Sequence, residues 1–306
     1  MSFKEPIRIP NFLKPGDTIG IAATARLILG DELKNALDIF HSWNLKVELA
    51  PNIGVGLNQF AGTDKERALG FQHLLDKPEV KAIFIARGGY GTARAIDLID
   101  FSRFEKDPIW ICGYSDITVL HGHLNKNYNC ASLHCNMPMG FPKEREHWAN
   151  TTIMKALFQG HCDIQSAPES LNIFGKCKGV VVGGNLSVLY SIRDTQSYPL
   201  TDDSVLFIED LDEYLYHIDR MMVGLKRAGA LNKLKGILVG GMTDMRDNEI
   251  PFGKTAKEIV HEHSVSLGIP VAFGIPIGHQ EDNRALILNR RMELEVGMYG
   301  ATLNFL

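Results

Sequence analysis

The fold of this 306-residue chain is indicated first by the ten residues IWICGYSDIT, at positions 109–118. An apolar run ends at Gly113, Ser115 follows two residues later, and a segment with helical character continues to about residue 125. A buried strand that turns sharply into a helix has this pattern. Such a turn exposes the Ser115 side chain at the carboxyl end of the strand, as a nucleophile requires, and directs the next backbone N–H groups toward its target. The alternative is that Ser115 simply caps the helix.

Apolar segments that alternate with helix-forming segments extend on both sides of this turn. Thr63 and Glu66 have the spacing of a capping box, which opens a helix between the second and third apolar segments. Strands that alternate with helices form a parallel sheet covered on both faces, and ligands bind such sheets beyond the carboxyl ends of the strands. We therefore predict an α/β domain over residues 1–160, with strands at 18–24, 47–50, 80–86, 108–114 and 131–137.

The second half of the chain has a different composition. The polar segment 161–175, which contains Pro168, predicts a linker. Residues 285–306 alternate apolar and polar side chains with turns between them, a pattern typical of antiparallel strands. Residues 176–306 are therefore expected to form a smaller, β-rich α/β domain, with further strands at 180–184, 204–208, 236–240 and 269–275.

The composition excludes several classes of partner. The formal net charge is −4 and no long basic stretch occurs, so no nucleic-acid partner is expected. No apolar run reaches the roughly 18 residues of a membrane-spanning helix, and residues 1–17 lack the apolar core of a signal peptide. We expect no membrane association and a cytoplasmic location. The five cysteines form no C-x-x-C pair, which gives no support to a disulfide framework or structural zinc.

A serine nucleophile needs a base to take its proton and a third group to orient that base. His279 follows a strand in a Gly-flanked loop, where catalytic groups tend to lie, although a surface histidine is the alternative. Glu209 directly follows an apolar strand, so it is partly buried and needs a partner. For its neighbours we favour a role as charges at a helix N-terminus; these are Asp210, Asp212 and Glu213.

The other paired histidines are poorer candidates. His121 and His123 lie on the helix after Ser115, too few turns away to fold back onto it easily. His261 and His263 are two residues apart, so they face opposite sides of a helix and form a weak metal site. No metal site is expected.

The segment RGGYG at residues 87–91 predicts a ligand-binding loop. It lacks the third glycine of the dinucleotide fingerprint, and no G-x-x-x-x-G-K-[ST] motif occurs in the chain. Gly88 and Gly89 let the backbone approach a ligand, and the N–H of Gly89 together with that of Asp116 would make a two-donor oxyanion hole. A plain glycine turn is the alternative. Arg87 is a candidate for binding a substrate carboxylate.

Together these segments resemble the LD-carboxypeptidase family of serine peptidases, a group that also holds microcin-C-type immunity hydrolases. The resemblance covers nearly the whole chain in order. It rests on LKPGD at 13–17, RGGYG at 87–91, GYSD at 113–116, GGNLS at 183–187, FIED at 207–210, IDR at 218–220 and GH at 278–279. Two segments depart from the family pattern and leave the substrate pocket open: HCNMP at 134–138 and DTQ at 194–196.

The resemblance implies that Ser115 is the nucleophile, Glu209 the orienting acid and His279 the base. The nucleophile then lies in one domain and its partners in the other, with the site in the cleft between them. The implied reaction is hydrolysis of the L,D peptide bond before a terminal D-alanine in murein tetrapeptides, through an acyl-enzyme and without metal or cofactor. The family also implies a homodimer and a role in peptidoglycan recycling. Candidates for substrate contacts, taken from the glycine loop itself, are Arg87, Gly88 and Tyr90.

Three other functions remain open from the sequence. The first is an amide hydrolase of the same family that acts on a peptidyl-nucleotide or another acylated toxin, for which Tyr90 or Trp110 would stack a base. The second is a non-catalytic small-molecule binding protein built on two α/β lobes. The third, a dinucleotide-binding oxidoreductase, is disfavoured by the missing fingerprint.

Overall fold

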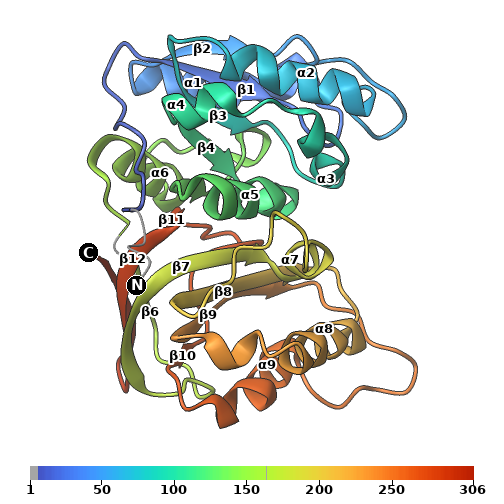
Figure 1. Ribbon diagram of the computed structural model, residues 1–306, viewed down its shortest axis with the longest axis vertical. Helices are drawn as coiled ribbons and strands as arrows, with labels where there is room; N and C mark the ends of the chain where they lie inside the picture. Colours follow the sequence, from blue (N-terminus) through green and yellow to red (C-terminus); the bar gives the residue numbers. More distant parts are fainter. Residues whose placement is uncertain (1–5, 163) are drawn as a thin grey trace.

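Two β-sheets, each with its own helices, lie one above the other in the computed structural model (Figure 1), which describes residues 6–162 and 164–306. The upper sheet has six strands in the order β11-β5-β4-β3-β1-β2. Five of them are parallel, as the alternation of strands and helices predicts. They are β1 (Thr18–Ala22), β2 (Lys46–Leu49), β3 (Val80–Ile85), β4 (Trp110–Gly113) and β5 (Ser132–His134).

Helices cover both faces of this sheet because alternate strand residues point to opposite sides. Phe84 of β3 packs in the core on the side of α1 (Lys34–Ser42) and α6 (Trp148–Gln159). Ile83 and Ile85 face the opposite side, which is covered by α2 (Asp64–Leu75), α3 (Thr92–Ala95), α4 (Ser102–Lys106) and α5 (Thr118–Tyr128).

The predicted capping box at the start of α2 is confirmed. The backbone N–H of Thr63 donates to Glu66 Oε2 at 2.7 Å, and Thr63 Oγ1 accepts from the N–H of Glu66 at 3.2 Å. These two hydrogen bonds satisfy donors that the first turn of a helix otherwise leaves without partners.

The lower sheet has seven strands in the order β10-β9-β8-β7-β12-β13-β6. The parallel part consists of β7 (Gly175–Asn185), β8 (Ser204–Leu211), β9 (Gly236–Thr243) and β10 (Val271–Ala272). The antiparallel part consists of β12 (Arg290–Gly297), β13 (Gly300–Phe305) and β6 (Ile164–Ser166). The predicted α/β fold with a β-rich second domain is thus confirmed.

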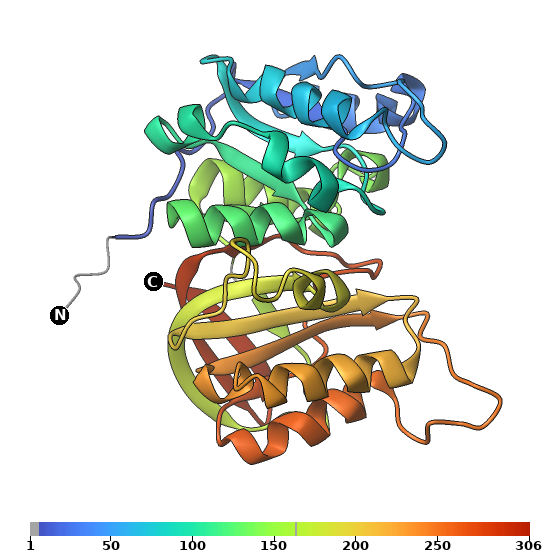
Figure 2. The same ribbon diagram turned by 45° about the vertical axis from the view of Figure 1, so that its right-hand side comes forward.

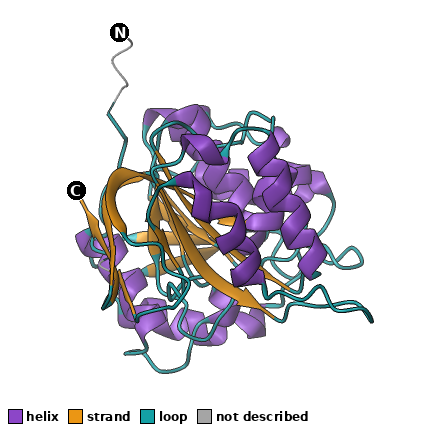
Figure 3. Ribbon diagram, turned by 90° about the horizontal axis from the view of Figure 1, so that it is seen from below, coloured by secondary structure: helices purple, strands orange, loops and turns teal. Residues whose placement is uncertain are grey.

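The lower sheet curves, with β7 arching along one side of the domain (Figure 2). One face is covered by α7 (Leu186–Ser191), α8 (Leu215–Arg227) and α9 (Ala256–Ser264). The view from below shows helices packed beside the strands (Figure 3). The other face encloses a second apolar core built from the strands themselves, including Phe207, Leu238 and Met292. Among the described residues, no helix is long and apolar enough to cross a membrane.

Two short strands differ from the prediction, β6 in its existence and β11 in its partner. β6 falls inside the predicted linker 161–175 and pairs antiparallel with β13. β11 (Leu286–Leu288) belongs by sequence to the second domain, yet it pairs antiparallel with β5 and completes the upper sheet. Three residues are too few to show a periodic pattern, and their pairing is decided by tertiary contacts.

The two domains meet at the start of α5. Thr118 Oγ1 accepts a hydrogen bond from the backbone N–H of Asn185 at 3.0 Å. Gly184 has a φ of 142°, and a Cβ atom there would lie 2.4 Å from Thr118 Oγ1, so only glycine allows this approach. The contact joins the helix that follows Ser115 to the strand beside Glu209.

Candidate active site

The chain turns sharply after β4, as the sequence predicts. Ser115 has a φ of 65°, in the left-handed region that costs a non-glycine residue roughly 1–3 kcal/mol. It opens a 3₁₀ turn (Ser115–Ile117) that leads into α5. Strained serines on strand-to-helix turns are typical of nucleophile elbows, which hold the hydroxyl clear of the backbone.

His121 supports this turn from behind. Its Nε2 donates to the carbonyl of Gly113 at 2.9 Å, and its Nδ1 accepts from Ser132 Oγ at 2.8 Å. Complete burial lowers the pKa of His121 to about 4, so the ring is neutral. His121 is therefore a structural residue, in agreement with its exclusion as the base.

The glycine loop 87–91 lies directly beside Ser115. A Cβ atom at Gly88 would lie 3.3 Å from Ser115 Cβ and 3.0 Å from Met137 Cε. Gly89 has a φ of 114°, and its N–H donates to no atom of residues 6–162 and 164–306. This N–H is therefore available to a ligand next to the serine.

The glycine loop is held in place by side chains packed beneath it. The fully buried Arg67 donates from Nη1 to the carbonyls of Thr24 at 2.5 Å and Gly91 at 2.6 Å. The carboxylate of Asp116 accepts from the N–H of Thr92 at 2.8 Å. Burial raises the pKa of Asp116, against the hydrogen bonds from the Thr92 side chain and backbone. The side chain of Asp116 is thus structural, whereas its predicted role concerns its backbone N–H.

His279 and Glu209 form a buried pair. Glu209 is fully buried at the end of β8, and its Oε2 accepts from His279 Nδ1 at 2.6 Å and from the N–H of His279 at 3.1 Å. Burial lowers the pKa of His279, but the hydrogen bond and charge of Glu209, with the charge of Asp210, more than offset this and raise it above its usual range. With Nδ1 engaged, Nε2 is the ring nitrogen left for another partner.

The loop that carries His279 is shaped by Gly278. This residue has a φ of 101°, and a Cβ atom there would lie 2.7 Å from Glu209 Oε2. The N–H of Gly278 donates to Asn283 Oδ1 at 2.8 Å, and Asn283 Nδ2 donates to Asn136 Oδ1 at 2.6 Å. Asn136 follows β5 in the other domain, so this relay fixes the histidine loop relative to the nucleophile domain.

Asn283→Ala is expected to lower kcat by about tenfold with little change in KM, because loss of a buried positioning contact misplaces His279. Steady-state kinetics measures this split, and Asn283→Asp, which keeps the acceptor oxygen for Gly278, should retain more activity. Asn248→Ala, on an exposed loop, is the control. Wild-type kcat in Asn283→Ala would show that the relay does not position the base.

A pocket of about 500 Å³ lies between the domains and brings the predicted residues together. Ser115, His279, Arg87, Gly88 and Gly89 all line it, and Glu209 lies behind His279. Within the described residues, Ser115 Oγ forms no hydrogen bond with His279; such contacts commonly tighten when substrate binds.

The aromatic residues near the site differ in whether they line the pocket. Tyr90 is half exposed, with its ring 6.2 Å from that of Phe60, and it does not line the pocket, so its substrate contact stays a prediction. Trp110 is fully buried and its Nε1 donates to the Asn11 carbonyl, so it cannot stack a ligand. Tyr114 lines the pocket, with its ring 4.7 Å from that of His279.

The acids after Glu209 have separate partners. Asp210 accepts from Asn185 Nδ2 at 2.8 Å and from the N–H of Ser187 at 2.9 Å, so it anchors the start of α7. Burial, with the charge of Glu209, raises the pKa of Asp210 to about 7. Asp212 forms an ion pair with Arg246.

The remaining histidine pair is also separated. His261 Nδ1 contacts the Leu171 carbonyl at 2.9 Å, and His263 Nε2 contacts Asp219 Oδ1 at 2.8 Å. Across the part of the chain that the structure describes, no group of three or more His, Cys, Asp or Glu side chains is placed to hold a metal ion.

Sequence reasoning missed several residues of this site: Arg26, Arg67, Asn136, Asn283 and His134. The ring of His134 is fully buried 5.8 Å from that of Tyr114, and both of its nitrogens lack a hydrogen-bond partner among the described residues. Burial, with the nearby His121 and His279, lowers its pKa well below the usual range. Only the fold brings these side chains to the site, so no local motif marks them.

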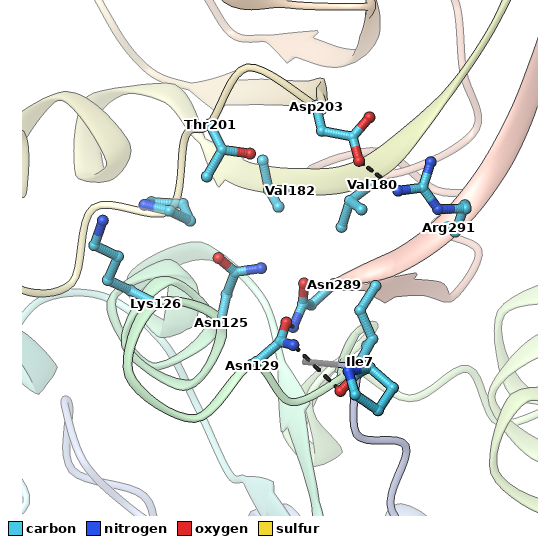
Figure 4. Close-up of a pocket in the computed structure, with 12 residues that line it drawn as sticks. Ile7, Asn125, Lys126, Asn129, Val180, Val182, Thr201, Asp203, Asn289 and Arg291 are labelled. Carbon is cyan, nitrogen blue, oxygen red and sulfur yellow. Dashed lines mark hydrogen bonds and ion pairs between the residues drawn. The ribbon is translucent and has the colours of Figure 1, made fainter. Parts of the chain in front are cut away.

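A second cavity, of about 560 Å³, lies elsewhere between the domains (Figure 4). Asn125 of α5 and Asn129, which follows this helix, lie opposite Val180 and Val182 of β7, and Asp203 forms an ion pair with Arg291 in its wall. Its described lining contains no serine, cysteine or histidine. It therefore offers neither a serine or cysteine nucleophile nor a histidine base.

A strained serine, an unpartnered loop N–H and a buried His–Glu pair around one pocket define the class of serine hydrolases. Residues 19–135 match the LD-carboxypeptidase N-terminal domain, and residues 178–294 match the LD-carboxypeptidase C-terminal domain. The chain belongs to the LD-carboxypeptidase family and is a serine-type peptidase.

Relatives and solved structures agree with this membership. The chain is 34% identical over 274 residues to a "Probable murein peptide carboxypeptidase" of Bacillus subtilis, covering 88% of this chain and 86% of the relative. It is 24% identical to the "Murein tetrapeptide carboxypeptidase" of Pseudomonas aeruginosa, covering 90% and 92%.

Two solved structures share the fold. A muramoyltetrapeptide carboxypeptidase from Oxalobacter formigenes has a TM-score of 0.86 at 24% identity, covering 94% of this chain and 98% of that one. The MccF protein, in complex with glutamyl sulfamoyl guanosine, has a TM-score of 0.87 at 19% identity, covering 98% and 99%.

Proposed function

We propose that this protein hydrolyses the L,D peptide bond before the terminal D-alanine of murein tetrapeptides, with Ser115, His279 and Glu209 as its triad. The observation that carries the proposal is the buried His279–Glu209 pair, joined at 2.6 Å, in the same pocket as Ser115. The names of the Bacillus and Pseudomonas relatives support the choice of substrate.

The proposed mechanism begins when His279 Nε2 takes the proton of Ser115 and Oγ attacks the carbonyl carbon of the scissile amide. The carbonyl oxygen becomes an oxyanion, which accepts hydrogen bonds from the N–H groups of Gly89 and Asp116. The intermediate collapses, and D-alanine leaves with the proton held by His279. Water, deprotonated by His279, then attacks the acyl ester. The ester C–O bond breaks, His279 returns the proton to Ser115 Oγ, and the shortened peptide leaves with a new carboxylate.

Glu209 would orient His279 and stabilise the imidazolium that forms during both steps. Because Glu209 accepts both from Nδ1 and from the backbone N–H of His279, it would fix the tautomer and the position of the loop together. Since these residues come from different domains, relative domain motion would change the distance between nucleophile and base.

The proposal is tested by measuring D-alanine release from free L-Ala-γ-D-Glu-diaminopimelate-D-Ala. The wild type should release D-alanine, and the same peptide ending in L-alanine should be a poorer substrate. No release, combined with hydrolysis of a peptidyl-nucleotide, would instead support the acylated-toxin hydrolase of the same family. Binding of the peptide without hydrolysis would support a non-catalytic binding protein.

The pH dependence of kcat/KM provides a second test. Since His279 must be neutral to accept a proton, and its pKa is raised above 6.5, activity should fall as pH falls through a value above 6.5. A pH–rate profile from pH 5 to 9 measures this acid limb. A limb centred well below 6.5 would contradict His279 as the base.

The homodimer and the cytoplasmic location remain predictions. Light scattering over a range of protein concentrations would measure the mass in solution, and a dimer is expected at about twice the chain mass of 34.0 kDa.

A further inference from the structure

The wall of the Ser115 pocket contains arginines that form no ion pair with any residue that the structure describes. Neither of its carboxylates pairs with a pocket arginine, because Asp210 accepts hydrogen bonds from Asn185 and Ser187, and Asp212 forms an ion pair with Arg246. Its two arginines, Arg26 and Arg87, have no carboxylate partner among residues 6–162 and 164–306. An arginine without an ion-pair partner in a pocket is available to an anionic ligand.

Arg26 is the less engaged of the two arginines. Its exposed guanidinium forms no hydrogen bond, ion pair or ring contact within the described chain, whereas Arg87 is half-buried and donates from Nη1 to the carbonyl of Leu27 at 3.3 Å. Arginine is the side chain best suited to a carboxylate, because its planar fork donates two parallel hydrogen bonds.

Arg26 also lies next to the predicted oxyanion hole. The Cβ atom that Gly89 lacks would lie 2.6 Å from both Cδ and Nε of Arg26, so the arginine side chain packs against Gly89, the residue whose N–H is proposed to bind the oxyanion. In a carboxypeptidase substrate, a single Cα separates the scissile nitrogen from the terminal carboxylate. A cation at this position is therefore within reach of that carboxylate while the scissile carbonyl lies at Gly89.

We propose that Arg26 binds the free terminal carboxylate of the substrate and so restricts the enzyme to cleavage of the last residue. This inference rests on the proposed function and adds to it a residue that determines exopeptidase specificity. The same chemistry would also suit the anionic linkage of an acyl-nucleotide, which the experiment below separates from the peptide carboxylate.

The test combines a change in the protein with a change in the substrate. The tetrapeptide is used with a free carboxylate and with a C-terminal amide, and kcat/KM is measured for wild type and Arg26→Gln. The wild type should prefer the peptide with the free carboxylate, and Arg26→Gln should lower kcat/KM for that peptide by about 10- to 100-fold. On the amide peptide, kcat/KM of Arg26→Gln should stay within about twofold of the wild-type value. On the carboxylate peptide, kcat/KM of Arg26→Lys should lie between those of the wild type and Arg26→Gln.

The matched control is Arg145→Gln, which removes one exposed positive charge outside the pocket lining. It should leave the preference for the carboxylate unchanged. The assignment would be overturned if Arg26→Gln kept the wild-type preference for the carboxylate peptide, or if its kcat/KM fell equally for both peptides.

Binding measurements separate this inference from the proposed function. Calorimetry with the Ser115→Ala protein, with and without Arg26→Gln, measures affinity for both peptides even if the wild type hydrolyses neither. Loss of affinity for the carboxylate peptide alone would support Arg26, whatever the reaction proves to be. Equal affinities for both peptides, or an Arg26 effect confined to an acyl sulfamoyl nucleotide, would overturn the assignment to a peptide carboxylate.

Discussion

Ser115→Ala is expected to lower the release of D-alanine from the free tetrapeptide by about 10⁴-fold or more, because the change removes the oxygen atom proposed to form the acyl-enzyme. The change removes one oxygen atom and keeps the Cβ atom, so the turn at φ 65° and the packing against Gly88 should persist. Purified proteins are compared by D-alanine release and by thermal unfolding. The unfolding midpoints should agree within a few degrees.

Ser266→Ala is a matched control for the loss of a hydroxyl, because Ser266 is exposed in the C-terminal domain, outside the pocket lining. It should retain wild-type activity. Release of D-alanine at the wild-type rate by a folded Ser115→Ala protein would remove Ser115 as the nucleophile. It would also leave the strained turn without a catalytic explanation.

Glu209→Gln is expected to lower kcat by about 10³- to 10⁴-fold, since an amide cannot stabilise the imidazolium and can favour the wrong tautomer of His279. The variant should also move the acid limb of the pH–rate profile to lower pH. Glu209 raises the pKa of His279 and burial lowers it, so loss of the carboxylate charge leaves burial less opposed. The pH–rate profiles of the two enzymes measure both effects.

Glu213→Gln provides a matched control. Glu213 Oε2 contacts His217 Nδ1 at 2.8 Å, which is the same kind of carboxylate–histidine contact but on the partly exposed surface near α8. Its activity and its acid limb should match those of the wild type. An unchanged acid limb in Glu209→Gln would show that Glu209 does not set the pKa of the base.

The parts of the fold that the sequence predicted are those with strong local periodicity. The β4 run ends at Gly113 and turns at Ser115 as expected, and the capping box at Thr63 opens α2. Apolar alternation and capping are local features, so a short window of sequence is enough to specify them. The strand β6 and the pairing of β11 with the upper sheet were not predicted, because both depend on partners more than 100 residues away.

The residues of the candidate site also fall into those that local sequence predicts and those that depend on distant contacts. The order of residue types could be predicted from the sequence: a serine after a strand, a glycine loop, an acid at a strand end and a histidine after Gly278. The side chains that support them are known only from how the chain folds. Asn136 reaches Asn283 across 147 positions, and Arg26 packs against Gly89 from the loop after β1. These contacts have no sequence signature because they depend on the packing of two domains, which brings distant polar side chains within hydrogen-bonding distance.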